Sequence, residues 1–374
     1  MRPILLIALA LRLIEVPGAP TAQPVAARVP PAKNVILFLA DAAGIPTINA
    51  ASRFGHDAPQ RLFVQHMPFI GLSDTSTASE WVTDSAAGMT AIVTGVKTHN
   101  GVISQGPDAV RGKTDGTPLK TLVDYAEEHG LSTGIISNDS VAGATPAALY
   151  AHVNDRGKYG DIVTQAFTSK VGDGLDVLIG SARAERAALT AAGRDLDTLA
   201  AAQKRTIYPT LEAVPAGAER VFVFTDNGEF DLQRAVNLAI SVLSRNPKGY
   251  FLMVESDAHT DRPEQGLRHL VQFDAIIEGV ARTASRDTLL LFTADHSFDL
   301  RIADGHMGDK VLAGLEGSAG RANPALRLAN VRVDNTHTGE EVLVAAQGPG
   351  AERVHGFMSN TDLFRIMLDA WGWK

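Results

Sequence analysis

The sequence predicts an α/β protein, a three-layer sandwich in which helices flank a mostly parallel central sheet. Helix-like and strand-like segments alternate along most of its 374 residues, as in folds built from parallel strands and crossover helices. Several strand-like segments are uninterrupted apolar runs, which is typical of strands that are buried on both faces. Together these two patterns indicate one large α/β unit.

The elements are justified by their patterns in chain order. A strand is expected at residues 33–41, where an apolar run ends in Asp41. A helix is expected at residues 121–130, because its amphipathic pattern is closed by Gly130. The later segments continue the alternation, with strands at 131–139, 174–181 and 220–228, a helix at 230–249, a strand at 250–260, a helix at 266–285, strands at 287–297 and 341–350, and a terminal helix at 360–373.

The two ends of the chain differ in character. Residues 1–27 are expected to be a signal peptide and leader, because Arg2 precedes a short apolar run that is followed by small residues and prolines. A disordered cytosolic leader is the alternative. We expect residues 28–374 to form a single domain, with a variable insert region at 158–218, where the pattern weakens. The leader predicts a soluble protein that is periplasmic or secreted.

The composition excludes some classes of function. A formal net charge of −8 argues against nucleic-acid binding, which requires a basic surface. It does not argue against anionic substrates, because a bound metal ion reverses the charge locally. The chain contains no cysteine, so any metal site must use histidine and carboxylate ligands.

The segment EWVTDSAAGMTAIVTG, residues 80–95, places Asp84 and Ser85 directly before a helical run of small residues. Both side chains can cap the free backbone N–H groups of a helix start. Alternatively, Ser85 is a nucleophile held at the positive end of that helix, where a phosphate group would bind. The segment alone leaves both interpretations open.

Acidic and histidine residues follow several of the apolar runs, and ligands of open parallel sheets bind at the carboxyl ends of the strands. The residues in such positions are Asp41, Glu255, Asp257, His259, Asp295 and His296. His337 lies in a polar segment just ahead of the strand at 341–350. Solvated strand ends can hold any one of these residues, but their joint occurrence favours a metal site.

Such a site suits phosphoryl transfer from an ester to a serine. Two divalent ions about 4 Å apart can stabilise the attacking oxygen and the leaving oxygen together. Zinc suits nitrogen and oxygen ligands, whereas magnesium suits an oxygen-only site. The planar guanidinium group of arginine suits the non-bridging oxygens of phosphate, and Arg156 is the candidate for that role.

Six segments together resemble the alkaline phosphatase family. In the family's order they are FLADAAG, TDSAAGMTAIVTG, ATPAALYAHVNDR, FLMVES, TADHS and NTHTGEEVLVAAQGPG, and they extend from about residue 33 to the C-terminus. The segments with Ser85, Arg156 and His337 separate this family from its sulfatase, mutase and nucleotide-pyrophosphatase relatives. The resemblance implies an alkaline phosphatase-like catalytic domain.

The resemblance also implies a role for each candidate residue. Ser85 would attack phosphorus to form phosphoserine, Arg156 would bind the phosphate, and Asp84 would orient Arg156. Two zinc ions and one magnesium ion would be bound. The implied ligands are Asp41, Asp295 and His296 for the zinc that activates the serine, Asp257, His259 and His337 for the zinc at the leaving group, and Asp41, Thr145 and Glu255 for magnesium.

Two departures from the family pattern matter. The family commonly spaces its ligands as Glu-x4-Asp-x3-His, whereas the loop here is the shorter ESDAHTD. We assign Asp257 and His259 to the leaving-group zinc, and Asp261 is the competing aspartate. Gly143 stands where many members carry Asp or His, so the identity of the third metal is left open.

These expectations describe an exported, metal-dependent phosphomonoesterase that acts on small phosphate monoesters. The alternatives are a phosphodiesterase or sulfatase of the same superfamily, or a non-catalytic relative that binds phosphate or metal. We expect no nucleic-acid partner and no transmembrane segment in the mature chain, and a homodimer is the possible assembly. All of this requires the loops with Asp41, Asp295 and His337 to meet at the Ser85 hydroxyl.

Overall fold

The computed structural model describes residues 30–315 and 325–373, and the expected leader at residues 1–27 lies outside them. The strands of the central sheet are β1 (Asn34–Asp41), β2 (Phe69–Ser73), β3 (Ser132–Ser140), β4 (Val177–Ser181), β5 (Ile207–Tyr208), β6 (Val221–Thr225), β7 (Tyr250–Asp257), β8 (Thr288–Thr293), β12 (Val342–Gln347) and β13 (Gly356–Met358). The helices are α1 (Ile45–His56), α2 (Ser85–Thr94), α3 (Leu122–Glu128), α4 (Ala144–Ala147), α5 (Tyr159–Gln165), α6 (Arg183–Ala191), α7 (Leu196–Ala202), α8 (Leu232–Leu243), α9 (Pro263–Thr283) and α10 (Asn360–Trp371).

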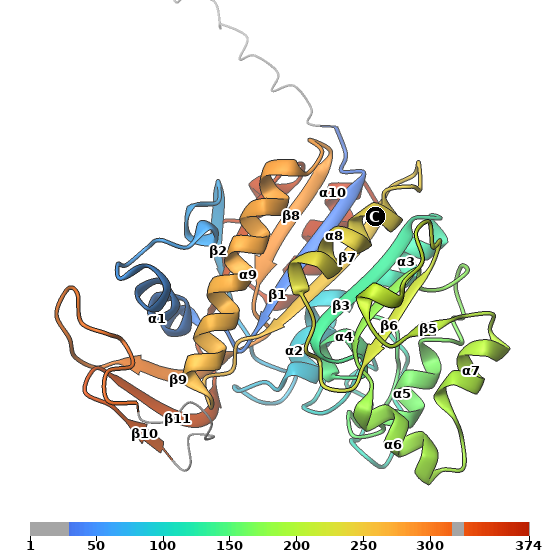
Figure 1. Ribbon diagram of the computed structural model, residues 1–374, viewed down its shortest axis with the longest axis horizontal. Helices are drawn as coiled ribbons and strands as arrows, with labels where there is room; N and C mark the ends of the chain where they lie inside the picture. Colours follow the sequence, from blue (N-terminus) through green and yellow to red (C-terminus); the bar gives the residue numbers. More distant parts are fainter. Residues whose placement is uncertain (1–29, 316–324, 374) are drawn as a thin grey trace, which may run out of the picture.

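Within the described residues, the central sheet has ten strands in the order β13-β2-β12-β8-β1-β7-β3-β4-β6-β5. Strand β12 runs antiparallel to both of its neighbours, β2 and β8, and the other neighbouring pairs are parallel. Helices cover the sheet on both faces (Figure 1). The predicted three-layer α/β sandwich with a mostly parallel sheet is confirmed.

Two apolar cores lie on the two faces of the sheet, because successive side chains of a strand point to opposite faces. On β1, Leu37 and Leu39 pack in one core with α2, α3 and α10, and Ile36 and Phe38 pack in the other with α1, α8 and α9. We call these the α2 face and the α9 face. By the same alternation, Asp41 at the end of β1 belongs to the α2 face.

The weakly patterned region at 158–218 forms α5, β4, α6, α7 and β5. Strand β4 pairs with both β3 and β6, so this region supplies part of the central sheet. The division of the chain into a leader, one domain and a variable insert stays a prediction.

A second sheet holds His337. Its strands are β9 (Ser297–Ile302), β10 (Ala325–Arg327) and β11 (Val331–Thr338), antiparallel in the order β10-β11-β9. We expected His337 in a loop, but it lies on β11 opposite Phe298. That expectation was wrong because the polar stretch DNTHT has little strand propensity of its own and is extended by pairing with β9.

Among the helices of residues 30–315 and 325–373, none combines the length and the apolarity that are needed to cross a bilayer.

Candidate active site

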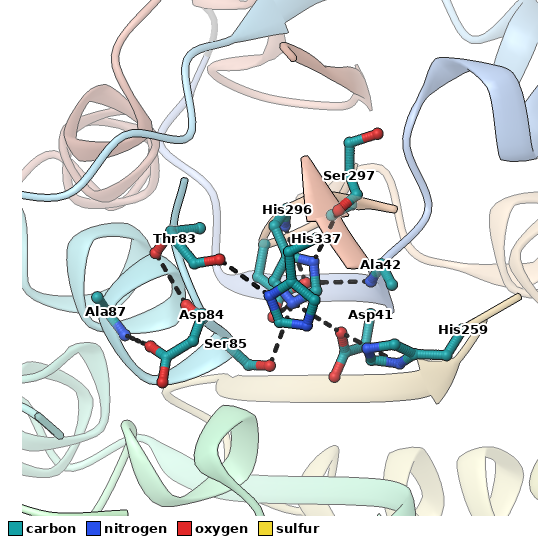
Figure 2. Close-up of polar contacts among 12 residues, drawn as sticks. Asp41, Ala42, Thr83, Asp84, Ser85, Ala87, His259, His296, Ser297 and His337 are labelled. Carbon is teal, nitrogen blue, oxygen red and sulfur yellow. Dashed lines mark hydrogen bonds and ion pairs between the residues drawn. The ribbon is translucent and has the colours of Figure 1, made fainter. Parts of the chain in front are cut away.

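Helix α2 begins with the two residues that the sequence left ambiguous. Asp84 is the N-cap residue, and its carboxylate accepts a hydrogen bond of 3.1 Å from the backbone N–H of Ala87. Ser85 is the first residue of the helix, and only 3% of its surface is exposed. Its Oγ lies 3.2 Å from Nε2 of His296 (Figure 2). The capping function therefore falls to Asp84, and the Ser85 hydroxyl points toward the histidine and carboxylate residues.

The small residues of α2 bring the helix start close to the end of β8. A Cβ atom built on Gly88 would lie 2.8 Å from the carbonyl oxygen of Asp295, closer than real side chains come. Glycine at this position therefore permits the approach of α2 to the segment that carries Asp295 and His296.

One group of potential ligands includes His296, the residue that contacts the Ser85 hydroxyl. Ligand atoms of Asp41, Asp295 and His296 all lie within 4.8 Å of one another. Nε2 of His296 lies 3.4 Å from Oδ1 of Asp41 and 3.5 Å from Oδ2 of Asp295. The other carboxylate oxygen of Asp295, Oδ1, accepts hydrogen bonds from the backbone N–H groups of Ala42 and His296, which fixes the plane of the carboxylate.

A second group consists of three histidines. Ligand atoms of His259, His296 and His337 also lie within 4.8 Å of one another. The rings of His296 and His337 are stacked with their centroids 3.9 Å apart, and the ring of His259 lies 5.8 Å from that of His337. Nδ1 of His337 donates to the carbonyl oxygen of Thr83 at 3.0 Å, so its Nε2 is the atom available to a metal ion (Figure 2). Sequence reasoning missed this contact, because it is made by the backbone carbonyl of Thr83 and does not depend on the identity of that residue.

Asp257 lies beside these groups without joining them. It pairs in register with Asp41, and its Oδ1 lies 2.8 Å from Nδ1 of His259. Its backbone N–H donates to the amide oxygen of Asn138, and its carbonyl oxygen contacts Nδ1 of His269 at 2.7 Å. Of the acids expected to bind metal, Asp257 and Glu255 are in neither ligand group of the described residues. The roles of Asn138 and His269 in holding Asp257 carried no clear signal in the sequence.

Of the buried oxygens that have no hydrogen-bond partner within the described chain, four belong to residues that we expected to bind metal. They are Oδ1 of Asp41, Oγ1 of Thr145, Oε2 of Glu255 and Oδ2 of Asp295. Thr145 and Glu255 are 1% and 3% exposed, and helix α4, which carries Thr145, packs against β7, which carries Glu255. Buried oxygens without partners are costly, on the order of 1–3 kcal/mol each, so several in one place call for a ligand.

Arg156 approaches the same helix start from the side. Its Nη1 donates to Oδ2 of Asp84 at 3.1 Å, and the arginine side chain remains about one third exposed. The carboxylate of Asp84 thus caps α2 with one oxygen and holds the guanidinium group with the other.

The charges of the site are set by burial and by the crowding of carboxylates. Burial outweighs the neighbouring charge of Asp295 and, together with His337 and His259, lowers the pKa of His296 to about 4, so His296 is neutral. Burial, followed by the charge of Asp41, raises the pKa of Asp295 to about 6. For His259, burial lowers the pKa, but Asp41 and Asp257 outweigh it and raise the pKa to about 10. The carboxylates around His259 therefore favour its protonated form, whereas burial keeps His296 neutral.

The sequence model of the alkaline phosphatase family matches residues 32–191 and 225–325 of this chain, more than half of it. The chain belongs to the alkaline phosphatase family. It is therefore a hydrolase of the alkaline phosphatase superfamily. The unmatched residues 192–224 overlap the expected insert region, and His337 lies beyond the matched stretches.

Individual relatives extend over nearly the whole chain. Streptomycin-6-phosphate phosphatase of Streptomyces griseus is 31% identical, with 96% of this chain and 95% of the relative aligned. The human tissue-nonspecific isozyme of alkaline phosphatase is 28% identical, over 89% of this chain and 73% of the relative. The structure of a histidine-to-aspartate variant of TAB5 alkaline phosphatase, from an Antarctic bacterium, with magnesium in its M3 site, has a TM-score of 0.74 and 26% identity, and covers 93% of this chain and 100% of its own.

Proposed function

We propose that this protein is an exported, metal-dependent phosphomonoesterase that hydrolyses small phosphate monoesters through a phosphoserine on Ser85. The observation that carries the proposal is the buried Ser85 hydroxyl at the start of α2, 3.2 Å from His296 and beside a group of mutually close ligand atoms. Helix starts favour anions, so an incoming phosphate would be stabilised there.

The residues fit the metal ions that the family resemblance implies. Asp41 and Asp295 each have a buried oxygen without a partner in the described chain, and the neutral imidazole of His296 lies between them. These three residues would hold one zinc ion. His259 and His337, together with Asp257, would hold the second; Asp257 is preferred to Asp261 because its carboxylate contacts His259. Asp41, Thr145 and Glu255 would hold a third ion, since all three have an unsatisfied buried oxygen.

Divalent ions bound in these positions would lower the pKa of the serine hydroxyl and of a water molecule, and would stabilise the leaving oxygen. The chain's own residues direct the rest of the reaction. Ser85 Oγ forms the bond to phosphorus as the bond to the ester oxygen breaks, and the alcohol leaves. Water then attacks phosphorus, inorganic phosphate departs, and Ser85 regains its hydroxyl proton.

Arg156 and Asp84 position the phosphate during both steps. Asp84 occupies one donor of the guanidinium group and fixes its plane, and the remaining donors suit two non-bridging oxygens. Asp84 itself is held by the backbone of α2 through Ala87, so the helix start and the arginine form one rigid unit.

The relatives support a phosphomonoester substrate. The curated protein at 31% identity is a streptomycin-6-phosphate phosphatase, whose name specifies a phosphorylated small molecule. We extend this substrate class, small-molecule phosphate esters, to the present chain. Export and a homodimeric assembly are proposals that rest on the leader-like residues 1–27 and on the usual assembly of the family.

The test uses three nitrophenyl substrates and one variant. With zinc and magnesium present, the wild-type protein should hydrolyse nitrophenyl phosphate faster than its diester or the nitrophenyl sulfate. Labelled phosphate should be trapped covalently on the wild-type protein at acid quench and not on Ser85→Ala. A dominant diester or sulfate rate would indicate the other superfamily activities, and phosphate binding without turnover would indicate a non-catalytic relative. Covalent label on Ser85→Ala would refute the assignment of the nucleophile.

A further inference from the structure

A buried glutamate of α6 contacts the turn that leads into α4, and the activity proposed above gives it no role. Glu185 lies in the first turn of α6, within the expected insert region, and its side chain is fully buried. Its Oε1 accepts hydrogen bonds from the Ser140 hydroxyl and from the backbone N–H of Ala142, the latter at 3.0 Å. Its Oε2 has no hydrogen-bond partner among the described residues. Burying a carboxyl group costs free energy that its hydrogen bonds must offset, so the turn is the feature that this residue serves.

The turn is short, and its backbone is held by other contacts as well. It extends from Ser140, the last residue of β3, to Gly143, which directly precedes α4. The backbone N–H of Val141 donates to the carbonyl oxygen of Ser181 at 2.8 Å, and the carbonyl oxygen of Val141 accepts from the Tyr150 hydroxyl at 2.7 Å. The N–H of Gly143 donates to the carbonyl oxygen of Ser140 at 3.0 Å. The backbone of the turn is therefore hydrogen-bonded on both sides of the position that α6 contacts.

This turn sets the position of Thr145, which follows Ala142 by three residues. Thr145 is 1% exposed, and its Oγ1 has no hydrogen-bond partner within the described chain. Helix α4, which carries it, has four residues and no side-chain cap at its start, so the helix does little to fix its own position. Helix α4 packs against β7, which carries Glu255, and against α2, which carries Ser85. A displacement of the turn would therefore move the Thr145 hydroxyl relative to both elements.

We propose that Glu185 is a positioning residue for the third cation, and that it acts through the turn at residues 140–143 to place the Thr145 hydroxyl. The inference rests on the proposed function for that cation position. The length of the side chain carries the effect rather than its charge, because both contacts use the single oxygen Oε1 and a neutral amide oxygen can accept the same bonds. Burial raises the pKa of Glu185, which agrees with a side chain that does not act through its charge.

Magnesium, which prefers oxygen ligands, is the probe, and its binding is measured without substrate. The protein is freed of metal, reloaded with zinc, and titrated with magnesium chloride by isothermal calorimetry. Glu185→Ala should weaken magnesium binding roughly 10–100-fold, as is typical when a group that supports a metal site from outside its ligands is lost. Glu185→Gln keeps the length and an acceptor oxygen, so it should retain the wild-type affinity. Glu185→Asp keeps the charge but withdraws the oxygens by one methylene group, so it should weaken binding.

Asp274→Ala is the matched control. Asp274 on α9 is also a buried carboxylate that holds a backbone turn, since its two oxygens accept from the N–H groups of Phe63 at 2.7 Å and Val64 at 3.0 Å. Val64 belongs to the core of the α9 face, whereas α4 packs in the core of the α2 face. In urea unfolding of the metal-free proteins both alanine variants should lose stability, but only Glu185→Ala should lose magnesium affinity. Zinc content should stay that of the wild type in every variant, because neither substituted residue is in a ligand group.

The outcomes separate this inference from the proposed function. Wild-type magnesium affinity in Glu185→Ala would overturn the inference, and so would an equal loss in Asp274→Ala, which would indicate general destabilisation. If Glu185→Ala does not fold, the other two variants decide, because a weakened Glu185→Gln beside an unaffected Glu185→Asp would indicate a role of charge and overturn the inference. A wild-type protein that hydrolyses phosphate monoesters with zinc alone and binds no magnesium would overturn the inference but leave the function standing. A protein whose magnesium binding depends on Glu185, yet which forms no phosphoserine, would do the reverse.

Discussion

The close approach of α2 to the end of β8 makes Gly88→Ala a test of how the nucleophile is positioned. The added Cβ would lie 2.8 Å from the Asp295 carbonyl oxygen. Ordinary contact begins at 3.4 Å, so the helix start and the strand end must separate by about 0.6 Å. Because Ser85 moves with α2 and His296 moves with β8, the same displacement acts on the reacting groups.

The expected size of the effect follows from two opposing terms. Alanine is favoured over glycine inside a helix by about 1 kcal/mol. Overpacking against a backbone oxygen costs about 1–3 kcal/mol. Gly279→Ala in α9 is the matched control, because its Cβ would approach nothing nearer than the Gln233 side chain at 3.7 Å. The helix term is common to both variants, so Gly88→Ala should be less stable than Gly279→Ala by about 1–3 kcal/mol.

The assay combines unfolding with kinetics. Urea unfolding of the metal-free proteins gives the difference in stability without a contribution from bound ions. In the metal-loaded proteins, kcat of Gly88→Ala should fall on the order of tenfold, since misplacement by a fraction of an ångström is already costly. Gly279→Ala should keep the wild-type kcat. If Gly88→Ala matched the control in both stability and kcat, the argument that glycine is needed for this approach would be refuted.

Two further predictions concern Arg156 and a buried acid far from the site. Arg156→Ala should raise the inhibition constant of inorganic phosphate roughly 10–100-fold, because charge-assisted hydrogen bonds of about 1.5–3 kcal/mol are lost; an unchanged constant in competition with nitrophenyl phosphate would speak against its role. Burial raises the pKa of Glu127 from 4.5 to about 7, so the folded state retains a proton that the unfolded state releases. Stability should therefore fall as the pH rises from 4.5 to 7, by about 3 kcal/mol from this residue. In unfolding experiments on the metal-free protein, Glu127→Gln should reduce the dependence of stability on pH between 4.5 and 7. An unaltered pH dependence would contradict the assignment of this effect to Glu127.

The sequence predicted the central sheet well because its strands carry their own signal. The apolar runs at 33–41, 250–260 and 287–297 became β1, β7 and β8. Burial on both faces forces such strands to be apolar throughout, so local sequence is sufficient to find them. The three are neighbours in the order β8-β1-β7, although β1 is more than 200 residues from the others in the chain. Adjacency of this kind cannot be read from the separate segments.

The second sheet had no comparable signal. β11 exposes much of one side and carries Asp334, Asn335 and His337, so its sequence resembles a loop. Its extended form depends on pairing with β9, and the position of His337 depends on the backbone of Thr83. Residues that act through the backbone, or through strands stabilised by tertiary pairing, leave no pattern at the scale of a single segment.

The position of a strand in the sheet explains what its terminal residue can do. Asp41 ends β1, which lies between β8 and β7. Its carboxylate therefore lies 3.4 Å from Nε2 of His296 on one side. On the other side, the residue pairs in register with Asp257 of β7. A residue at the end of an outer strand would face only one such neighbour. Asp41 is consequently the carboxylate best placed to be shared between cation positions. The order of the parallel strands and the alternation of side chains thus determine which acid lies near the cation positions, although composition alone does not distinguish these acids.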